Sequence, residues 1–470
     1  MGHRLFCGLE WGTVYSALLV CAGREARIFG LWYKRAVPQT HEAGLVRAIG
    51  RWSLVALTIN SVIGSGVFGL PSVVAGFAGR RSPLIVLAAG LMMAVIVSCF
   101  AEVASQFSEA GGPYRYVRTT LGRLMGIETG WMLWTSQVTA VAANANLFVI
   151  YVGQFWPRAT QPAARIAILT ALIWLLAAVN YRGVKAGTQF SNVFTVAKLL
   201  PLAAVIAGGA MYALAHPGAG GAGASTLSGQ GGLKAMLLLV FAYGGFETAL
   251  APMSEARDPR RDTVFALFMA IAACTVLYTS MQWIVMRTLA DPAGSARPVA
   301  DVAQLFSGRV GAGAIAVGAL ISLYGYLSAK ILANPRITFA LAEEGDFPAW
   351  FGAVHPRFRT PHVSIVVFAG LCWAMAVSGS FASNVTLSAV GRLFYYAAGC
   401  GALLVLRKRQ PSAEAFRMPG GAALAVVGIG ICTALLAGVD RSGSLFLIAT
   451  VAAGLVNWLW VRRRAAGLGR

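Results

Sequence analysis

The stretch Leu54–Pro71, LVALTINSVIGSGVFGLP, decides the fold of this chain. It is mostly apolar, yet Gly64, Ser65 and Gly66 stand at its centre. Each glycine inside a helix costs about 1 kcal/mol relative to alanine, so this segment is poorly suited to a continuous helix. In a membrane, a break of this kind is tolerated where it is buried in protein or lines a cavity. The sequence therefore predicts a helix broken near Gly64 or, as the alternative, a small-residue face for close helix packing.

The composition indicates a polytopic membrane protein. Hydrophobic residues make up 57% of the 470 residues, charged residues make up 12%, and the mean hydropathy is +0.69. The formal net charge is +21 at pH 7, but the basic residues lie in short clusters between apolar runs. The positive-inside rule accounts for this pattern, which favours anionic lipid headgroups over nucleic acid as partners. We expect a lipid bilayer around the chain and no nucleic acid partner.

The cysteines and the motif content argue against an enzyme. Common signatures of metal and nucleotide sites, HExxH and GK[ST], do not occur in the sequence. The seven cysteines fall singly and mostly within apolar runs, which favours small apolar packing roles over a disulfide or metal framework: Cys7, Cys21, Cys99, Cys274, Cys372, Cys400 and Cys432. We expect no metal site, no cofactor and no catalytic residues.

Twelve apolar stretches follow residue 50, each long enough to cross the hydrocarbon core of a bilayer. They lie near residues 53–79, 84–106, 124–155, 164–181, 189–212, 232–253, 264–287, 311–341, 362–379, 384–406, 421–439 and 443–461. Every second loop is rich in basic residues: Arg115, Arg118, Arg123, Arg182, Lys185, Arg257, Arg260, Arg261, Arg357, Arg359, Arg407, Lys408, Arg409, Arg462, Arg463 and Arg464. This predicts an all-α polytopic membrane protein of about 12 transmembrane helices with both termini cytoplasmic.

The sixth apolar stretch, like the first, has glycines at its centre. Gly244 and Gly245 stand side by side within Phe241–Glu247, FAYGGFE. The second break lies five spans after the first, so the two run in opposite directions, as in an inverted repeat that binds a substrate between its halves. Glu247 places a carboxylate inside an apolar span, which costs several kcal/mol unless it is paired or protonated. We expect Glu247 either to handle protons or to hold the broken backbone.

We divide the chain into three parts. Residues 1–50 form an N-terminal extension to which the sequence assigns no role. Residues 51–407 form a transport core of two inverted repeats, at about 51–212 and 232–407, joined by a Gly-rich segment expected to be a flexible external loop. Residues 408–470 hold two additional C-terminal transmembrane helices and a short basic tail.

Four segments resemble signatures of a known transporter superfamily. They are Ile63–Phe68 with Pro71, Ala101–Tyr114, Phe241–Arg261 and Pro335–Pro361. In their order and spacing they resemble the amino acid, polyamine and organocation (APC) superfamily, of the bacterial amino acid permease type. The resemblance covers roughly residues 50 to 410. It implies a 5+5 inverted repeat with broken helices 1 and 6.

The resemblance also implies an amino acid site at the two breaks. The substrate carboxylate would lie on exposed amides of the first break, here Gly64, Ser65 and Gly66, since a helix N-terminus favours an anion. Its ammonium would lie on free carbonyls of both broken helices, here Val62, Ile63, Ala242, Tyr243 and Gly244. An aromatic residue of the sixth span gates the site in relatives, and Phe241 occupies the matching position.

Two lysines and several amides within the spans are further candidates. Similar sequences place a lysine at Lys198 where sodium-coupled relatives bind a cation, so its ammonium is expected to bridge the first and eighth spans. A desolvated lysine releases its proton readily, which favours proton coupling, although a lysine that reaches one surface is the alternative. Lys330 either faces the cavity, where it would favour acidic side chains and repel cationic ones, or faces away. Gln137, Asn144 and Asn146 either line the pocket or join helices.

The sequence thus predicts a secondary active transporter that moves amino acids across the cell inner membrane by alternating access. Proton-coupled symport is the favoured mechanism, with protons as the coupling ion. The alternatives are an antiporter that exchanges an amino acid for an amine, a polyamine or another amino acid, and a sensor that binds without transport. Ion pairs of Glu102 and of the cluster Glu255–Arg261 are expected to close the inner gate.

Overall fold

The structure is a computed structural model of the chain, which divides into two units, residues 1–46 and 47–470. The residues that it describes all belong to the second unit and are 50–107, 112–183, 189–218, 220, 229–250, 256, 258–409 and 415–468. The predicted N-terminal extension up to residue 49, the centre of the predicted loop and Glu255 lie outside the described residues.

The elements of this part of the chain are α-helices and short 3-10 helices. Their bounds are α3 (Arg51–Val62), α4 (Gly66–Ala78), η1 (Gly79–Arg81), α5 (Ser82–Ser105), α6 (Gly112–Leu121), α7 (Arg123–Val152), η2 (Pro157–Thr160), α8 (Pro162–Tyr181), α9 (Gln189–Ala215), α10 (Gly229–Tyr243), α11 (Phe246–Ala249), α12 (Pro259–Thr288), α13 (Pro298–Glu343), η4 (Ala349–Gly352), α14 (His362–Ser378), α15 (Phe381–Arg409), α16 (Gly421–Ala437) and α17 (Arg441–Leu468).

Each predicted apolar stretch coincides with one helix or with two helices joined at a break. Within the described residues, seven helical stretches are long and apolar enough to cross a membrane, and α10, α14 and α16 are shorter apolar helices. The prediction of an all-helical, polytopic fold is therefore confirmed, while the twelve crossings and the inverted repeat stay predictions. Two features were not predicted: the helix α6, and the early start of α13, which a positive φ of 64° at Gly308 interrupts.

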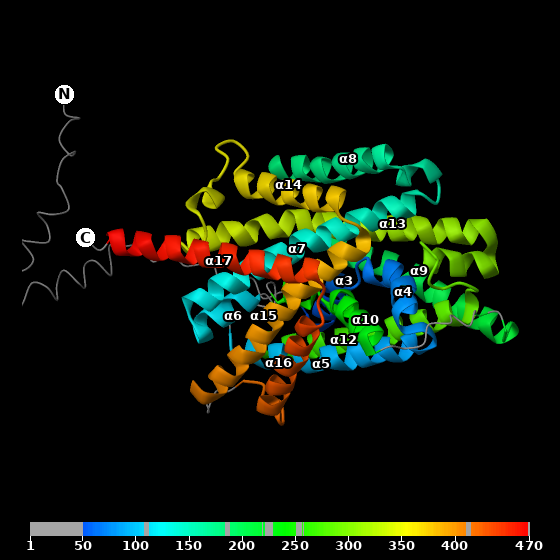
Figure 1. Cartoon of the computed structure of the whole chain (residues 1–470), viewed down its shortest axis with the longest axis horizontal. Helices are drawn as coiled ribbons and strands as arrows, with labels where there is room; N and C mark the ends of the chain where they lie inside the picture. The colour runs from blue at the N-terminus through cyan, green and yellow to red at the C-terminus, as the bar shows by residue number, and fades with distance from the viewer. Residues whose placement is uncertain are drawn as a thin grey trace, which may run out of the picture. The chain divides into compact units, whose positions relative to one another are not determined.

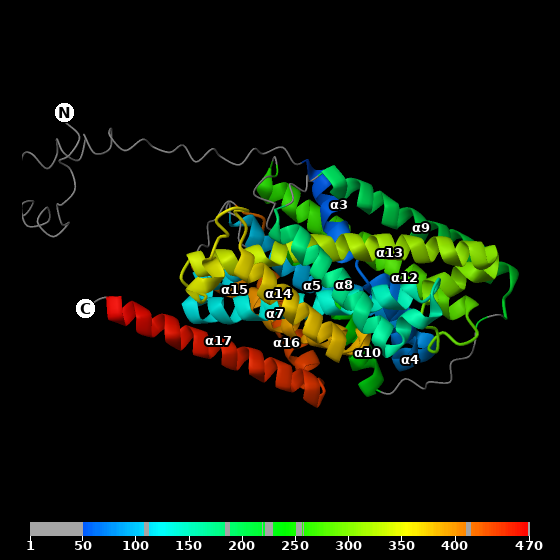
Figure 2. The same cartoon turned by 90° about the horizontal axis from the view of Figure 1, so that it is seen from above.

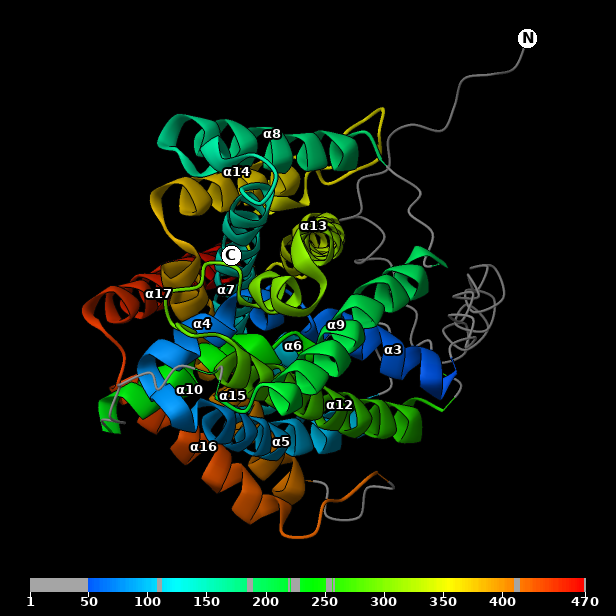
Figure 3. The same ribbon diagram turned by 90° about the vertical axis from the view of Figure 1, so that its right-hand side faces the viewer.

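The broken helices lie at the centre of the helices of the second unit. In Figure 1, α3, α4 and α10 lie between α7 and α13 on one side and α5 and α12 on the other. Figure 3 shows α8 beside α14 at one edge and α5 with α16 at the opposite edge, and both pairs are in contact. Figure 2 shows α17 along the outside, where it contacts α7 and α15. The outer helices thus cover the two breaks.

The interior and the outer surface of these helices are both apolar. One cluster of buried hydrophobic side chains joins α3, α4, α5, α10, α12 and α15, and a second joins α7, α8, α13 and α14. Large apolar side chains are also exposed on the outside, among them Leu91, Leu214, Val276, Val310 and Val456. Extensive exposed apolar surface is typical of a protein that contacts lipid.

Candidate functional site

The two breaks are in direct contact. A Cβ atom added at Gly66 would lie 2.9 Å from the Cα atom of Ala242. A Cβ atom added at Gly245 would lie 2.2 Å from the carbonyl oxygen of Ser61. Gly245 also has a φ of 115°, a conformation in which a side chain is strained. These glycines therefore let the two broken helices touch, which larger residues would prevent.

The first break presents a buried polar group without a partner. The Ser65 backbone N–H donates to Asn144 Oδ1 over 3.1 Å, and Asn144 Nδ2 donates to Ala140 O over 2.8 Å. The Ser65 hydroxyl is fully buried and has no hydrogen-bond partner among the described residues. Because an unpaired buried hydroxyl costs free energy, this position favours a ligand that accepts or donates a hydrogen bond.

Tyr278 of α12 links the two broken helices. Its hydroxyl lies 3.3 Å from Val62 O and 3.2 Å from Ala242 O, two of the carbonyls predicted to hold the substrate ammonium. The ring of Tyr278 lies 5.2 Å from that of Tyr243, whose own hydroxyl donates to Val86 O of α5 over 3.0 Å. The sequence analysis missed Tyr278, because a tyrosine in an apolar helix carries no signal of its own.

Lys198 of α9 binds the end of the first broken helix. Its Nζ donates to Ile63 O over 3.0 Å and to Asn60 O over 3.3 Å. These carbonyls lie at the C-terminal end of α3, where the helix dipole favours a cation. In the described part of the chain, its hydrogen bonds go to Asn60 in the last turn of α3 and to Ile63 directly after it, and none goes to the eighth span. The side chain is 4% exposed, which disagrees with the alternative of a lysine that reaches one surface.

Glu247 lies at the centre of the second break and is surrounded by donors. Its Oε2 accepts from the Gly245 N–H at 2.9 Å and from the Tyr396 hydroxyl at 3.1 Å. Its Oε1 accepts from the Tyr395 hydroxyl at 2.8 Å and from Arg392 Nη1 at 2.6 Å. The side chains of Glu247 and Arg392 are each 1% exposed. The carboxylate therefore belongs to a buried ion pair that joins α11 to α15.

The sequence analysis did not identify Arg392, although a signal was present. Arg392 lies within the predicted apolar stretch 384–406, and an ionisable residue inside a span is a functional candidate by default. Its Cζ lies 5.9 Å from the ring centre of Phe241, the predicted gate. A Cβ atom added at Gly244 would lie 1.9 Å from Arg392 Nη1. Arg392 thus lies against Phe241, Gly244 and Glu247, three residues at the second break.

Lys330 of α13 faces the interior rather than the lipid. The side chain is buried, and its Nζ lies 5.4 Å from the ring centre of Tyr326. The same ring covers Gly64, where an added Cβ atom would lie 3.3 Å from two of the ring carbons. Lys330 also interacts electrostatically with Glu247 and Arg392. Lys330 is therefore buried and not exposed to lipid, and its position in the substrate cavity stays a prediction.

The three amides of α7 have different roles. Gln137 Nε2 lies 3.5 Å from Glu247 Oε1, and Gln137 Oε1 has no partner among the described residues. Asn144 holds the Ser65 amide of the first break. Asn146 instead accepts from Arg165 Nη2 over 2.7 Å, so it joins α7 to α8. Gln137 and Asn144 therefore lie at the breaks, and Asn146 is structural.

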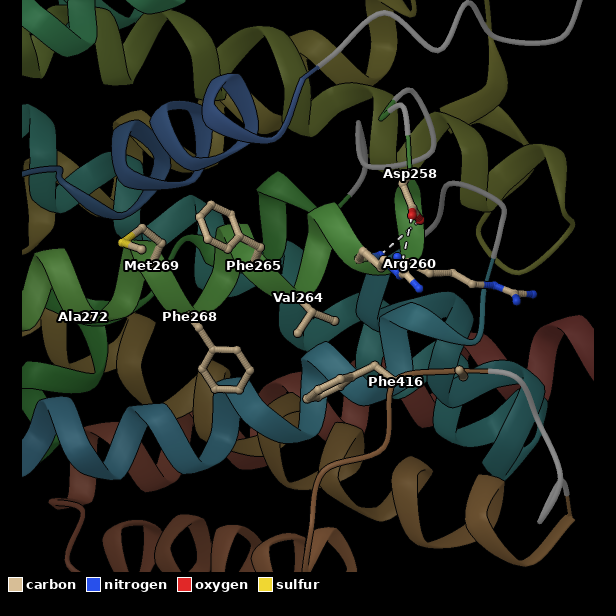
Figure 4. A pocket seen from close by; sticks show the side chains of 10 residues that line it. Asp258, Arg260, Val264, Phe265, Phe268, Met269, Ala272 and Phe416 are labelled. Atoms are coloured by element: carbon tan, nitrogen blue, oxygen red, sulfur yellow. Dashed lines mark hydrogen bonds and ion pairs between the residues drawn. The ribbon is translucent and has the colours of Figure 1, made fainter.

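A cavity of about 380 Å³ reaches Glu247 from the side of α6. Tyr114, Leu133 and Asn334 are among the residues that line it. A larger groove of about 930 Å³ lies between the start of α12 and Phe416 and is shown in Figure 4. The residues that line this groove include none of the predicted substrate or coupling residues. Of these two cavities, the smaller one is therefore the one that reaches Glu247 beside the second break.

Ion pairs around one buried carboxylate lie at the end of the bundle that carries α6. Asp346 is fully buried and accepts from the Tyr114 hydroxyl at 2.5 Å, from Arg118 Nε at 2.6 Å and from Arg123 Nε at 2.6 Å. Burial and the nearby carboxylates raise the pKa of Tyr114, so its phenol stays protonated and donates. The Tyr114 hydroxyl oxygen also lies 2.9 Å from Glu344 Oε2, a second possible acceptor for the same proton. These bonds connect α6 and α7 to the segment that follows α13.

The predicted gate residues pair differently from one another. Glu102 binds Arg407 through two hydrogen bonds of 2.7 and 2.8 Å and connects α5 to α15. Asp258 and Arg261 lie 3.9 Å apart and are exposed, so this pair contributes at most about 1 kcal/mol. Among the described residues, no three His, Cys, Asp or Glu side chains gather closely enough to hold a metal ion.

Comparison with known proteins identifies the family of this chain. The sequence profile of the family described as "Amino acid permease" matches residues 49–457. The chain is 28% identical over 450 residues to the methylthioribose transporter of Bacillus subtilis (strain 168), covering 91% of this chain and 96% of the relative. It is 26% identical over 453 residues to the branched-chain amino acid permease BcaP of the same organism, with the same coverage.

A third relative is named as an exchanger. The serine/threonine exchanger SteT of Bacillus subtilis is 26% identical over 383 residues, which cover 79% of this chain and 85% of the relative. The resemblance noted from the sequence is confirmed, since the family profile extends over most of the chain. This chain belongs to the amino acid permease family of the APC superfamily.

Proposed function

We propose that this permease carries an amino acid through the site between the two breaks by alternating access, with uptake driven by protons. The supporting observation is the buried Ser65 hydroxyl without a partner, at the place where the two broken helices touch. A substrate carboxylate placed here would accept from Ser65 and lie at the start of α4, where the helix dipole favours an anion. We place the carboxylate beside the backbone of Gly64, Ser65 and Gly66, next to the Tyr326 ring that covers Gly64.

The substrate ammonium would bind the carbonyls of the second broken helix and of α3. Tyr278 lies near both Val62 O and Ala242 O, but one hydroxyl donates to one acceptor at a time. Because Val62 O also accepts from the Gly64 N–H over 2.9 Å, Ala242 O is the carbonyl that we propose for the ammonium. We place the backbone of Tyr243 and Gly244 beside it, with Phe241 as the gate.

Lys198 is the proposed coupling residue. As an ammonium it is held by Ile63 O and Asn60 O at the end of α3. Loss of the proton would weaken both bonds and remove the cation from the helix C-terminus, where it is favoured. The protonation of Lys198 would thereby be linked to the shape of the first break. The exchanger among the relatives supports antiport as the second candidate mechanism.

Lys330 and the basic loops bear on specificity and orientation. Because Lys330 faces the interior near Arg392, we propose that it disfavours substrates with cationic side chains. The loops rich in Lys and Arg support a location in the cytoplasmic (inner) membrane with both termini in the cytoplasm.

Transport into proteoliposomes tests this function. The panel contains labelled branched-chain amino acids, serine, threonine, arginine, a polyamine and methylthioribose, each with an inward proton gradient and with or without internal counter-substrate. We expect the gradient alone to drive uptake of a neutral amino acid, and Lys198→Met to abolish this uptake. The matched control is Lys234→Met, which removes an exposed lysine of α10 and should leave uptake unchanged.

Two results would contradict the proposal in different ways. If flux appears only when counter-substrate is present inside the liposomes, the protein is an exchanger and not a symporter. Binding of an amino acid without any flux would show that the chain is a sensor.

A further inference from the structure

The hydrogen bonds around the carboxylate of Glu247 favour its ionised form over its protonated form. Of the groups that face it, the Arg392 guanidinium and the Gly245 N–H donate and cannot accept a hydrogen bond. A protonated Glu247 would therefore lose at least one of these bonds or turn its hydroxyl toward a tyrosine. The remaining polar and charged neighbours are Tyr395 and Tyr396 of α15, Gln137 of α7, and Lys330 and Tyr326 of α13.

We propose that Arg392 is a positioning residue that keeps Glu247 as a permanent anion, so that Glu247 anchors the second break and does not carry the transported proton. This inference rests on the proposed proton-coupled transport. It decides between the two roles that the sequence left open for Glu247, and it assigns a function to an arginine that the sequence analysis did not consider.

The anchor acts on the backbone of the break. Glu247 Oε2 holds the N–H of Gly245, the residue with the left-handed φ of 115°. The Arg392 guanidinium occupies the space that a side chain at Gly244 would need, and it lies over the ring of Phe241. The ion pair thus fixes both the turn between α10 and α11 and the predicted gate. The ion pair therefore connects α15 to the break.

The competing role for Glu247 has a physical route. The cavity of about 380 Å³ on the side of α6 has Glu247 in its lining, so a proton could reach the carboxylate from there. The two roles predict different effects when Glu247 is replaced by a neutral residue. Removing one member of a buried ion pair leaves an uncompensated charge and is strongly disruptive, whereas replacing both members is much less so. A proton carrier, in contrast, cannot be replaced by a neutral residue without loss of coupling.

The test compares wild type, Glu247→Gln, Arg392→Gln and the double variant in proteoliposomes. Each is measured for uptake driven by a proton gradient, for exchange without a gradient, and for the pH profile of both. We expect each single variant to lose about tenfold or more in both activities together, because a buried charge loses its partner. The double variant should recover exchange to within about fivefold of wild type and keep gradient-driven accumulation with an unchanged pH profile.

One outcome would overturn the proposal directly. If Glu247→Gln or the double variant exchanges substrate but no longer responds to the proton gradient, Glu247 carries the proton. Failure of the wild type to accumulate substrate under the gradient would instead refute the proposed symport. In that case the exchange measurements still test the anchor, through the predicted recovery in the double variant.

A conservative variant keeps the test valid if the double variant does not fold. Arg392→Lys retains a positive charge that can reach Glu247, so we expect slower transport with an unchanged KM and pH profile. A shift of the pH profile in this variant would contradict the inference. Arg165→Gln is the matched control, since Arg165 donates to carbonyls at the end of α14, away from the breaks. It should lower thermal stability without changing KM or the response to the gradient.

Discussion

The first break, between α3 and α4, is held by neutral groups on its amide side, whereas the second break, between α10 and α11, is held by an ion pair. At the first break, Asn144 accepts from the Ser65 amide and the Ser65 hydroxyl has no partner among the described residues. At the second break, both oxygens of Glu247 accept several hydrogen bonds, including those from Arg392.

This difference separates two tasks that a substrate site requires. A polar group that lacks a partner gains by binding a ligand, whereas a group whose bonds are complete gains nothing from one. The first break therefore has the properties of a binding surface, and the second has those of an anchor. The following predictions, from the largest expected effect to the smallest, test this division.

Substituting one glycine at each break should distinguish the two breaks most clearly. In Gly245→Ala, a left-handed alanine costs about 1–2 kcal/mol, and its Cβ would collide with Ser61 O. We expect a several-fold loss of folded protein and no detectable transport. Gly66→Ala has no unfavourable φ, so it should fold in greater yield and lose transport through the contact with Ala242. Folded yield is measured by size-exclusion chromatography in detergent.

The control for these variants is Gly430→Ala in α16, where an added Cβ atom meets no atom within 4 Å. Helix propensity favours alanine there, so stability should stay equal or rise slightly. Equal yields of Gly245→Ala and Gly430→Ala would mean that the second break does not depend on the left-handed residue.

Removing Asn144, the neutral side chain that supports the first break, should have an intermediate effect. Asn144→Ala leaves the buried Ser65 amide without its acceptor, which costs about 1–3 kcal/mol. We expect the KM for the substrate to rise about tenfold, because the amides no longer keep their arrangement. The matched control is Asn146→Ala, which loses the contact with Arg165 and should leave KM unchanged. A similar rise in KM for both variants would show a general loss of packing in α7.

The link between the breaks should have the smallest effect. Tyr278→Phe removes one hydroxyl, and a net hydrogen bond contributes about 0.5–1.5 kcal/mol. Since the carbonyls of Val62 and Ala242 then become available together, we expect KM to change by no more than about threefold. Tyr324→Phe, on the exposed side of α13, should have no effect. A rise in KM of more than about tenfold in Tyr278→Phe would show that Tyr278 is part of the binding site itself.

Part of the site was predictable because it depends on local chemistry. Closely spaced glycines weaken a helix wherever they occur, so Gly64, Gly66, Gly244 and Gly245 indicated both breaks before any contact was known. Glu247 stood out for the same reason, since a carboxylate in an apolar span always requires a partner. Arg392 could have been found by the same rule and was not.

The identity of each partner could not be predicted, since it depends on distant parts of the chain. Arg392 and Asn144 lie 145 and 79 positions away from the groups that they bind, Glu247 and the Ser65 amide. Lys198 was expected to reach the eighth span, and it binds α3 instead. A sequence shows that a buried charge requires compensation, but several residues of suitable chemistry are always available to provide it.

The sequence by itself determined where the helices lie, where two of them break, and which family the chain resembles, because apolar length, glycine content and short motifs are properties of neighbouring residues. The tertiary structure alone decided that one break keeps a buried hydroxyl without a partner while the other is closed by an ion pair. That outcome depends on which side chains of α7, α9, α12 and α15 approach within hydrogen-bond distance, and helix packing sets those distances.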